Sequence, residues 1–443
     1  MDSVDYLSDR ALANLRLYRY SAVDKSPTSQ YILRHYWNWA VTLFPMWMAP
    51  NLITLIGFCF VWINLLFIVI WMPDLEGPAP AWMYFSFAAG IWLYSTFDNV
   101  DGKQARRTGT SSPLGELFDH GCDALNCSVG AIVQAASLGL GHTWYTGAIV
   151  FMTTIAFYFS TWEEYHTGTL YLGYLNGPTE GLIIACIMSI ISGIKGPQVW
   201  HQLATDALPA WMTVFPASWS LIDYSLTGML ILLFTLNVPF SIHAVYRVCR
   251  GPTPKSSFRE ACVQVVPMAI FLACNAIWLA APYSIALEQH VILFMLANGI
   301  VFGRMATKII LAHVTKMPFP MFSTGLLIPL AIGAALVLFP SVTGIVILTP
   351  TLESIYIWGY AIAAAITYMH WAVVVINKFC AYLDINCLTI KKRRTGALTY
   401  IYYLFFYYFL PFLPIPLPHC FVFVFVLTIF FNRCPTHCHS VSE

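Results

Sequence analysis

Apolar stretches of about 20 residues recur along most of this chain, and they constrain the fold more than any other feature. A helix needs about 20 apolar residues to cross roughly 30 Å of hydrocarbon. Of the 443 residues, 58% are hydrophobic and only 10% are charged, which excludes an ordinary soluble protein. The apolar runs are continuous rather than alternating, which excludes a membrane β-barrel. We therefore predict an all-α integral membrane protein, a polytopic bundle of about ten transmembrane helices.

The positions of the predicted spans follow from the apolar runs. They cover residues 50–72, 80–98, 116–141, 143–162, 176–195, 220–246, 261–284, 288–313, 322–348 and 353–381. Residues 1–35 are polar and charged, so we expect no signal peptide there and insertion directed by the first span. With the N-terminus in the cytosol, lysine and arginine gather in the cytosolic loops, and Lys195 is the exception. This asymmetry is what the positive-inside rule requires, and it supports both the number of spans and their orientation.

Charged residues are scarce, so their clustering around the end of the second span and the start of the third is informative. Asp98 and Asp101 are three residues apart, and Asp119 and Asp123 are four apart. On helices these spacings place each pair on one face, so two neighbouring helices can bring four carboxylates together at the cytosolic edge of the bilayer. Without a cation the four acids would repel one another and lose solvation. Oxygen ligands without a Cys or His cluster favour Mg²⁺ or Mn²⁺ over zinc.

Two glycines and an arginine flank these acids. Gly102 and Gly115 have no side chain, so a phosphate or a nucleotide can approach the backbone closely. Arg106 offers a planar fork to phosphate oxygens, and carboxylate-bound Mg²⁺ usually has substrate phosphate among its ligands. We therefore expect a phosphate-containing substrate beside the metal. The alternative is that the acids merely lie at helix ends and pair with Lys103, Arg106 and Arg107.

These spacings resemble the signature of the CDP-alcohol phosphotransferase family. The signature's fixed positions correspond to Asp98-x2-Asp101-Gly102-x2-Ala105-Arg106-x8-Gly115-x3-Asp119-x3-Asp123. The similarity is closest to the eukaryotic choline/ethanolamine phosphotransferases. It extends through Pro50-Asn51-Leu52-Ile53-Thr54, the Asp119-His120-Gly121-Cys122-Asp123 form of the second half, and Trp162-Glu163-Glu164-Tyr165-His166-Thr167-Gly168. It covers about residues 10–392.

The resemblance implies a reaction, a membrane and a set of site residues. CDP-choline or CDP-ethanolamine and diacylglycerol would give phosphatidylcholine or phosphatidylethanolamine and CMP. The resemblance also implies ten spans, a homodimer, and an active site that faces the cytosol from the endoplasmic reticulum or Golgi membrane. Two Mg²⁺ ions, for which Mn²⁺ can substitute, would be bridged by the pyrophosphate and held by Asp98, Asp101, Asp119 and Asp123. The CDP-alcohol pocket would be lined by Asn51, Gly102, Ala105, Arg106, Gly115 and Glu116.

An alcohol acceptor must lose a proton during the reaction, and His120 is the only imidazole inside the motif. Because imidazoles titrate close to neutral pH, we predict that His120 is the general base. Asp123 is the rival, although metal coordination would make it a poor base. A structural histidine that caps the third span is the alternative to both.

Recognition of the headgroup and the nucleotide is predicted from smaller signals. Residues 162–166 supply aromatic faces and acids that suit a quaternary ammonium, and an interfacial belt with solvated acids is the alternative. Glu116 is the better single candidate for contact with the donor. Asn51 is either a donor ligand or an N-cap of the first span. Arg304 and Lys308 are expected to snorkel.

Four parts of the chain follow from these patterns. We expect a cytosolic segment with an interfacial helix at 1–48, a catalytic bundle at 49–246, further membrane helices with a dimer contact at 247–390, and an atypical basic, aromatic and proline-rich tail at 391–443. Aromatic residues within 12–48 could instead form a plain belt that anchors the first span. Prolines interrupt the tail, and we expect no catalytic role for residues 396–443. The twelve cysteines show no paired spacing, which indicates small buried side chains without disulfides.

Two other functions compete with this prediction. A CDP-alcohol phosphotransferase that uses CDP-diacylglycerol is disfavoured by the ten-span length. An ion-coupled transporter is disfavoured because its acids would lie near the membrane midplane and not at a cytosolic rim. The net charge of +1 gives no indication of a nucleic-acid partner.

Overall fold

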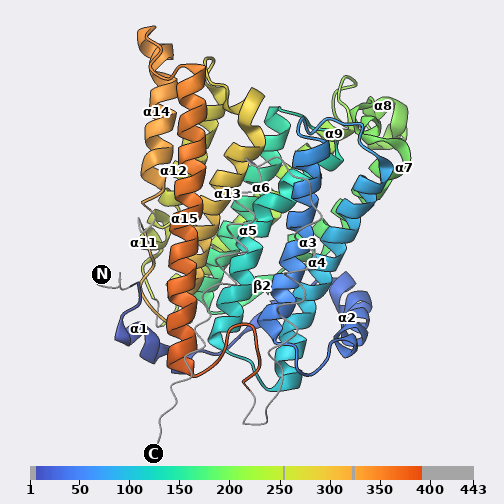
Figure 1. Cartoon of the computed structure of the whole chain (residues 1–443). Coiled ribbons are helices and arrows are strands. Elements are labelled where there is room, and N and C mark those ends of the chain that lie inside the picture. Colours follow the sequence, from blue (N-terminus) through green and yellow to red (C-terminus); the bar gives the residue numbers. More distant parts are fainter. Residues whose placement is uncertain (1–5, 253–254, 322–324, 392–443) are drawn as a thin grey trace, which may run out of the picture.

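The computed structural model describes residues 6–252, 255–321 and 325–391, and most of these residues are helical. Long helices stand side by side, and shorter ones flank them at both ends (Figure 1). The long helices are α3 (Pro50–Trp71), α4 (Ala81–Thr108), α5 (Pro113–Ser137), α6 (Trp144–Thr167), α7 (Leu182–Lys195), α9 (Leu221–Leu232), α10 (Val238–Cys249), α12 (Val266–Ala280), α13 (Ala286–Val314), α14 (Leu327–Thr343) and α15 (Pro350–Leu383). Shorter helices are α1 (Asp9–Asn14), α2 (Arg34–Ala40), α8 (Ala204–Ala207) and α11 (Phe258–Val263).

Turns of 3₁₀- and π-helix extend or connect these elements. They are η1 (Leu15–Leu17), η2 (Ser29–Leu33), η3 (Val41–Leu43), η4 (Gly177–Gly181), η5 (Pro197–His201), η6 (Ala210–Met212) and η7 (Leu233–Asn237). Within the described residues one sheet is formed, by two short parallel strands, β1 (Ala22–Asp24) and β2 (Leu170–Leu172), with Ala22 opposite Leu170.

The predicted class, an all-α polytopic membrane protein, is confirmed. Six helical segments of the described chain are long and apolar enough to cross a membrane: Pro50–Trp71, Gly177–Lys195, Leu221–Cys249, Phe258–Ala280, Ala286–Val314 and Pro350–Leu383. The other four predicted spans correspond to α4, α5 and α6, which are long but less apolar, and to the shorter α14. The number of ten spans therefore stays a prediction.

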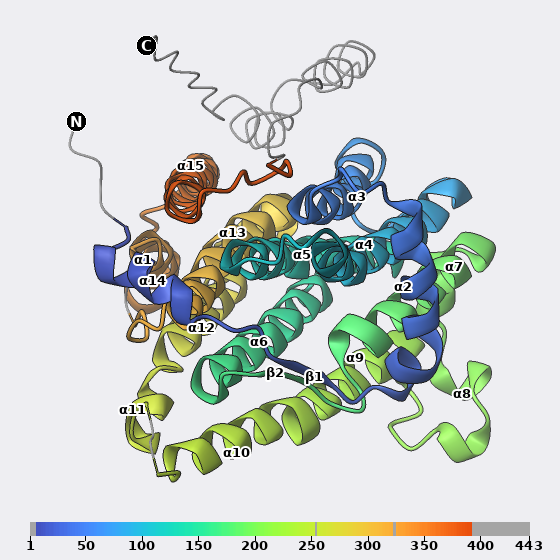
Figure 2. The same cartoon turned by 90° about the horizontal axis from the view of Figure 1, so that it is seen from below.

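Helix α5 occupies the centre of the bundle, between α3, α4, α6 and α13 (Figure 2). Glycines allow close packing at two helix pairs, α13 with α5 and α3 with α4. On α13, a Cβ added to Gly299 would lie 2.6 Å from Ser128 Cβ of α5. A Cβ added to Gly303 would lie 2.7 Å from Leu125 Cδ2 of α5. A Cβ on Gly57 of α3 would lie 2.7 Å from Phe97 Cβ on α4. These close approaches bring α13 against α5 and α3 against α4.

Two boundaries differ from the sequence prediction. Helix α4 continues to Thr108, well past the end of the predicted span at residue 98, so Asp101 and Gly102 lie in the same helix as Asp98. Helix α4 ends at Gly109, whose φ of +67° is in the left-handed region that glycine adopts easily. The segment 12–48 is not one helix, because β1 interrupts it.

Some predictions fall partly or wholly outside the described residues. The tail at 391–443 lies outside them except for Lys391. Nine of the twelve cysteines are described and all nine are free, as predicted for that part of the chain. The expectation that they are buried is wrong for most of them, because only Cys186 and Cys274 of these nine are buried, six are half-buried and Cys262 is exposed.

Candidate functional site

The first half of the site is a group of carboxylates on α4 and α5. Oxygen atoms of Asp98, Asp119 and Asp123 all lie within 4.8 Å of one another, an arrangement that could hold a metal ion. Asp101 is buried beside them, within hydrogen-bonding reach of Asp119. The packing of α4 beside α5 therefore brings the two pairs together as expected, while the role of these residues as metal ligands stays a prediction.

Neighbouring helices hold two of these acids in place. The Thr54 hydroxyl on α3 donates a hydrogen bond to Asp101, and the Tyr94 hydroxyl on α4 donates one to Asp123. Oδ1 of Asp98 and Oδ1 of Asp119 are buried and have no hydrogen-bond partner among the described residues. A buried carboxylate oxygen without a partner is costly, so these atoms fit a bound cation. The sequence prediction missed Tyr94, although its spacing of four from Asp98 places both on one helix face.

The alternative in which the acids pair with nearby basic residues is wrong for Lys103 and Arg107. Lys103 Nζ donates to Asn38 Oδ1 at 2.8 Å. Arg107 Nη1 donates to the carbonyl oxygens of Val41 and Phe44, both at 2.8 Å. These bonds attach the N-terminal segment to α4, so the side chains of Lys103 and Arg107 bond to that segment and not to the aspartates.

The residues expected to line the nucleotide pocket lie at the ends of α3, α4 and α5. A Cβ on Gly102 would meet only Arg106 Nη1, at 3.7 Å, so the backbone there is open to a ligand. A Cβ on Gly115 would lie 3.8 Å from Asn51 Oδ1, which places Asn51 beside the start of α5. The N-cap interpretation of Asn51 is wrong, because Ala49 is the N-cap of α3. Ala105 is half-buried on α4, and Arg106 is exposed.

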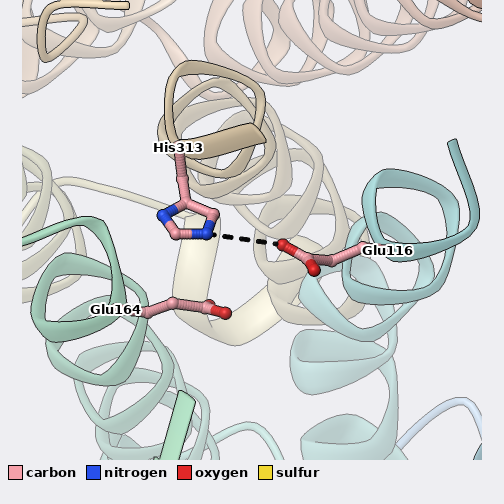
Figure 3. Close-up of side chains that lie close together, drawn as sticks. All are labelled: Glu116, Glu164 and His313. Atoms are coloured by element: carbon pink, nitrogen blue, oxygen red, sulfur yellow. Dashed lines mark ion pairs between the residues drawn. The ribbon is translucent and has the colours of Figure 1, made fainter. Parts of the chain in front are cut away.

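A second polar cluster lies beside the aspartates, and three helices contribute to it. Glu116 of α5, Glu164 of α6 and His313 of α13 point toward one another, with ligand atoms within 4.8 Å (Figure 3). All three are buried, with exposed fractions of 7%, 4% and 4%. His313 Nε2 lies 3.7 Å from Glu116 Oε1, and His120 Nδ1 lies 3.8 Å from Glu164 Oε2. His120 therefore connects this cluster to the aspartates on α5. The sequence prediction missed His313, which no motif marks.

The side chains of the predicted headgroup segment, residues 162–166 at the end of α6, do not face one common site. All five residues from 162 to 166 are buried, so the interpretation as an interfacial belt with solvated acids is wrong. Only Glu164 of this segment is paired with His120. His166 Nε2 lies 2.8 Å from Gln264 Oε1, and Glu163 interacts with Ser241. Helical geometry separates these side chains, because adjacent residues lie on different faces.

The expectation that Arg304 snorkels is also wrong. Its side chain is buried against α15, where Nη1 donates to the Thr367 carbonyl oxygen at 2.6 Å and the guanidinium lies over the Trp371 ring. The carbonyl and the ring offer the charge a partner inside the bundle.

A hollow opens between α3, α5, α13 and α15. Its lining is almost wholly apolar. Gly121 and Cys122 are among the lining residues, so the hollow reaches the turn of α5 that carries His120 and Asp123. An apolar cavity at this place suits a lipid chain.

The N-terminal strand runs beside the polar end of the site. Leu170 N donates to the Ser21 carbonyl oxygen at 3.0 Å, which holds the neighbouring Tyr20 near the end of α6. Although 56% of Tyr20 is exposed, the protein atoms around its phenol, and then the charges of Asp119, Glu164 and Asp98, raise the pKa of Tyr20 above its ordinary value. The phenol of Tyr20 therefore lies near Asp119, Glu164 and Asp98 at the polar end of the site.

Comparisons with known proteins agree with this geometry. Residues 47–215 match the family model described as CDP-alcohol phosphatidyltransferase. The choline/ethanolaminephosphotransferase 1 proteins of Saccharomyces cerevisiae and Arabidopsis thaliana are each 34% identical to this chain, over 88% of it and 99% of their own length. The ethanolaminephosphotransferase 1 of Mus musculus is 28% identical over 90% of this chain and 98% of its own.

Proposed function

This chain belongs to the CDP-alcohol phosphotransferase family, and we propose that it transfers phosphocholine or phosphoethanolamine from CDP-choline or CDP-ethanolamine to diacylglycerol. The products are phosphatidylcholine or phosphatidylethanolamine and CMP. The observation that carries the proposal is the convergence of Asp98, Asp119 and Asp123 within 4.8 Å, beside the open backbone of Gly102.

Divalent ions suit the four aspartates. The chemistry of an all-oxygen donor set and the unpartnered oxygens of Asp98 and Asp119 fit two Mg²⁺ ions, with Mn²⁺ as a substitute. Bound there, such ions would neutralise the charge that develops on the phosphates. The protein's own contribution is to hold the carboxylates in place, through Thr54 on Asp101 and Tyr94 on Asp123.

His120 is the general base in this proposal. Its Nδ1 faces Glu164, so Nε2 is the ring nitrogen that accepts the proton of the diacylglycerol hydroxyl. As the proton moves, the hydroxyl oxygen forms its bond to the β-phosphorus and the bond from that phosphorus to the CMP oxygen breaks. The nearby Glu164 carboxylate stabilises the imidazolium that results. Asp123 is the weaker candidate because the Tyr94 hydroxyl and the aspartate cluster already engage it.

The two substrates would reach His120 from different sides. The apolar hollow beside Gly121 and Cys122 suits the acyl chains of diacylglycerol, which is itself dissolved in the bilayer. The nucleotide would lie over Gly102 and Gly115, with Asn51, Ala105 and Arg106 around it. We also propose, from the distribution of basic residues, that this end of the bundle faces the cytosol. An endoplasmic reticulum or Golgi location and a homodimer belong to the same proposal.

The test is an assay of the purified protein in detergent with diacylglycerol, Mg²⁺ and each CDP-alcohol in parallel. We expect one CMP released for each phospholipid formed, with turnover abolished by chelation of the metal and in Asp119→Asn. A well-folded sample that releases no CMP from either donor would contradict the proposed function.

A further inference from the structure

The cluster of Glu116, Glu164 and His313 buries two carboxylates that have no lysine or arginine within ion-pair distance among the described residues. The charge of Lys316 acts on both carboxylates from farther away. In the described part of the chain their ion pairs are with histidines alone, at 3.7 and 3.8 Å, which is too long for a hydrogen bond. Glu116 Oε1 and His313 Nδ1 have no hydrogen-bond partner there, although both residues are more than nine-tenths buried. Buried anionic groups without compensation are costly, so the cluster is built to receive a cation.

The position of the cluster indicates which cation it receives. Glu116 and His120 are four residues apart on α5, and Asp119 lies between them, so the cluster begins one helical turn from the aspartates. In the proposed substrates the headgroup nitrogen is joined to the reacting phosphate by only two carbons. A donor whose phosphates lie at the aspartates therefore has its cationic end within reach of the cluster.

On this basis we propose that Glu116, Glu164 and His313 form the subsite for the ammonium of the donor headgroup, and that the subsite prefers the primary ammonium of CDP-ethanolamine. The inference rests on the proposed function and adds the group that recognises the headgroup. A primary ammonium has three N–H donors, and the cluster offers carboxylate oxygens and an imidazole nitrogen as acceptors.

A quaternary ammonium has no N–H and binds mainly to aromatic faces. The two aromatic rings of α6 beside Glu164 are already packed against other groups. The Tyr165 ring packs edge-on against His166 and Phe319 and carries Lys255 Nζ 4.9 Å from its centroid. The Trp162 ring packs edge-on against Phe159 and His166. Tyr20, which is 56% exposed, is a further aromatic residue near Glu164. One ring is not an aromatic cage, so the hydrogen-bond acceptors of the cluster favour ethanolamine over choline.

Equilibrium binding tests the subsite without depending on turnover. CDP-ethanolamine, CDP-choline and CDP would each be titrated, with Mg²⁺ present, into the full-length wild type, Glu116→Gln and His313→Ala. Losing a hydrogen bond to a charged group costs about 1.5–3 kcal/mol, so we expect CDP-ethanolamine to bind at least about tenfold more weakly to Glu116→Gln. CDP, which lacks the headgroup, should bind with unchanged affinity. Glu163→Gln is the matched control, because the Glu163 side chain bonds to Ser241 and offers no ligand atom to the cluster, although its charge acts on the neighbouring Glu164.

Three outcomes would overturn the assignment. Equal weakening of CDP and CDP-ethanolamine would show that Glu116 holds the nucleotide. Unchanged CDP-ethanolamine binding in both folded variants would show that the cluster does not hold the headgroup. A count of bound Mn²⁺ that falls by one in both Glu116→Gln and His313→Ala would show that the cluster is a metal site. Failure of the proposed function is distinguishable, because it would appear as absent CMP release in the wild type even where the donors bind.

Discussion

The hydroxyl of Thr54 donates a hydrogen bond to the carboxylate of Asp101, and this bond joins α3 to the acidic face of α4. The contact exists because Gly57, three residues later on α3, allows the two helices to pack closely. An acid at the bundle's polar end is thereby held in one orientation by a neighbouring helix.

Replacing Thr54 by valine should weaken metal binding without removing a ligand. Valine has nearly the same shape but no hydroxyl, and a hydrogen bond to a charged group is worth about 1.5–3 kcal/mol. We expect the Mg²⁺ concentration that gives half-maximal activity to rise by about tenfold. Thr54→Ser keeps the hydroxyl and should behave like the wild type. An unchanged metal requirement in Thr54→Val would refute this role of the bond.

His120→Ala should lower turnover without changing the affinity for the CDP-alcohol. If His120 accepts the proton of the acceptor hydroxyl, turnover should fall by about 10² or more, because general base catalysis contributes about that much. The affinity for CDP-alcohols, measured by titration, should remain nearly unchanged. Asp123→Asn is the comparison, and it should lose metal binding as well as turnover. Near-normal turnover in His120→Ala would remove histidine from the mechanism.

Filling the apolar hollow should affect only the lipid substrate. Ala365 of α15 lines the hollow, and phenylalanine at this position would occupy space that the acyl chains need. Overpacking an apolar site costs about 1–3 kcal/mol, so we expect the KM for diacylglycerol to rise by about tenfold, with the KM for the CDP-alcohol unchanged. Ala363→Phe places the same side chain on the exposed face of α15 and is the control. Equal KM values for diacylglycerol in the wild type and Ala365→Phe would place the acceptor elsewhere.

Lys255 should react with acylating reagents at an unusually low pH. Although Lys255 is exposed as a residue, the protein atoms around its ammonium, and then the charge of Lys316, lower the pKa of Lys255 from its ordinary value to about 8. As the pH rises through about 8 the ammonium loses its proton and becomes a nucleophile, whereas an ordinary lysine does so near 10.4. Mass spectrometry of acetylation between pH 7 and 10 measures this. A labelling midpoint for Lys255 near that of ordinary lysines would contradict the expected shift.

Each aspartate pair was predictable because its two members are close in the sequence and therefore close in space. Spacings of three and four place two acids on one helix face wherever the helix lies, and Asp98, Asp101, Asp119 and Asp123 depend on little else. The membrane class was predictable for a similar reason, since the length and polarity of each segment are local properties. The end of α4 was missed because charged residues marked the membrane boundary, whereas the helix itself stops at Gly109.

The sequence by itself thus determined that the chain is a membrane-spanning helical protein, that it carries four aspartates at one end, and that it resembles the CDP-alcohol phosphotransferases. Only the tertiary structure decided that Glu164 and His313, from α6 and α13, join Glu116 at that end, and that Arg304 turns inward to α15. Helix packing brings these residues together through small side chains such as Gly299 and Gly303, and no local periodicity records which helix will be the neighbour.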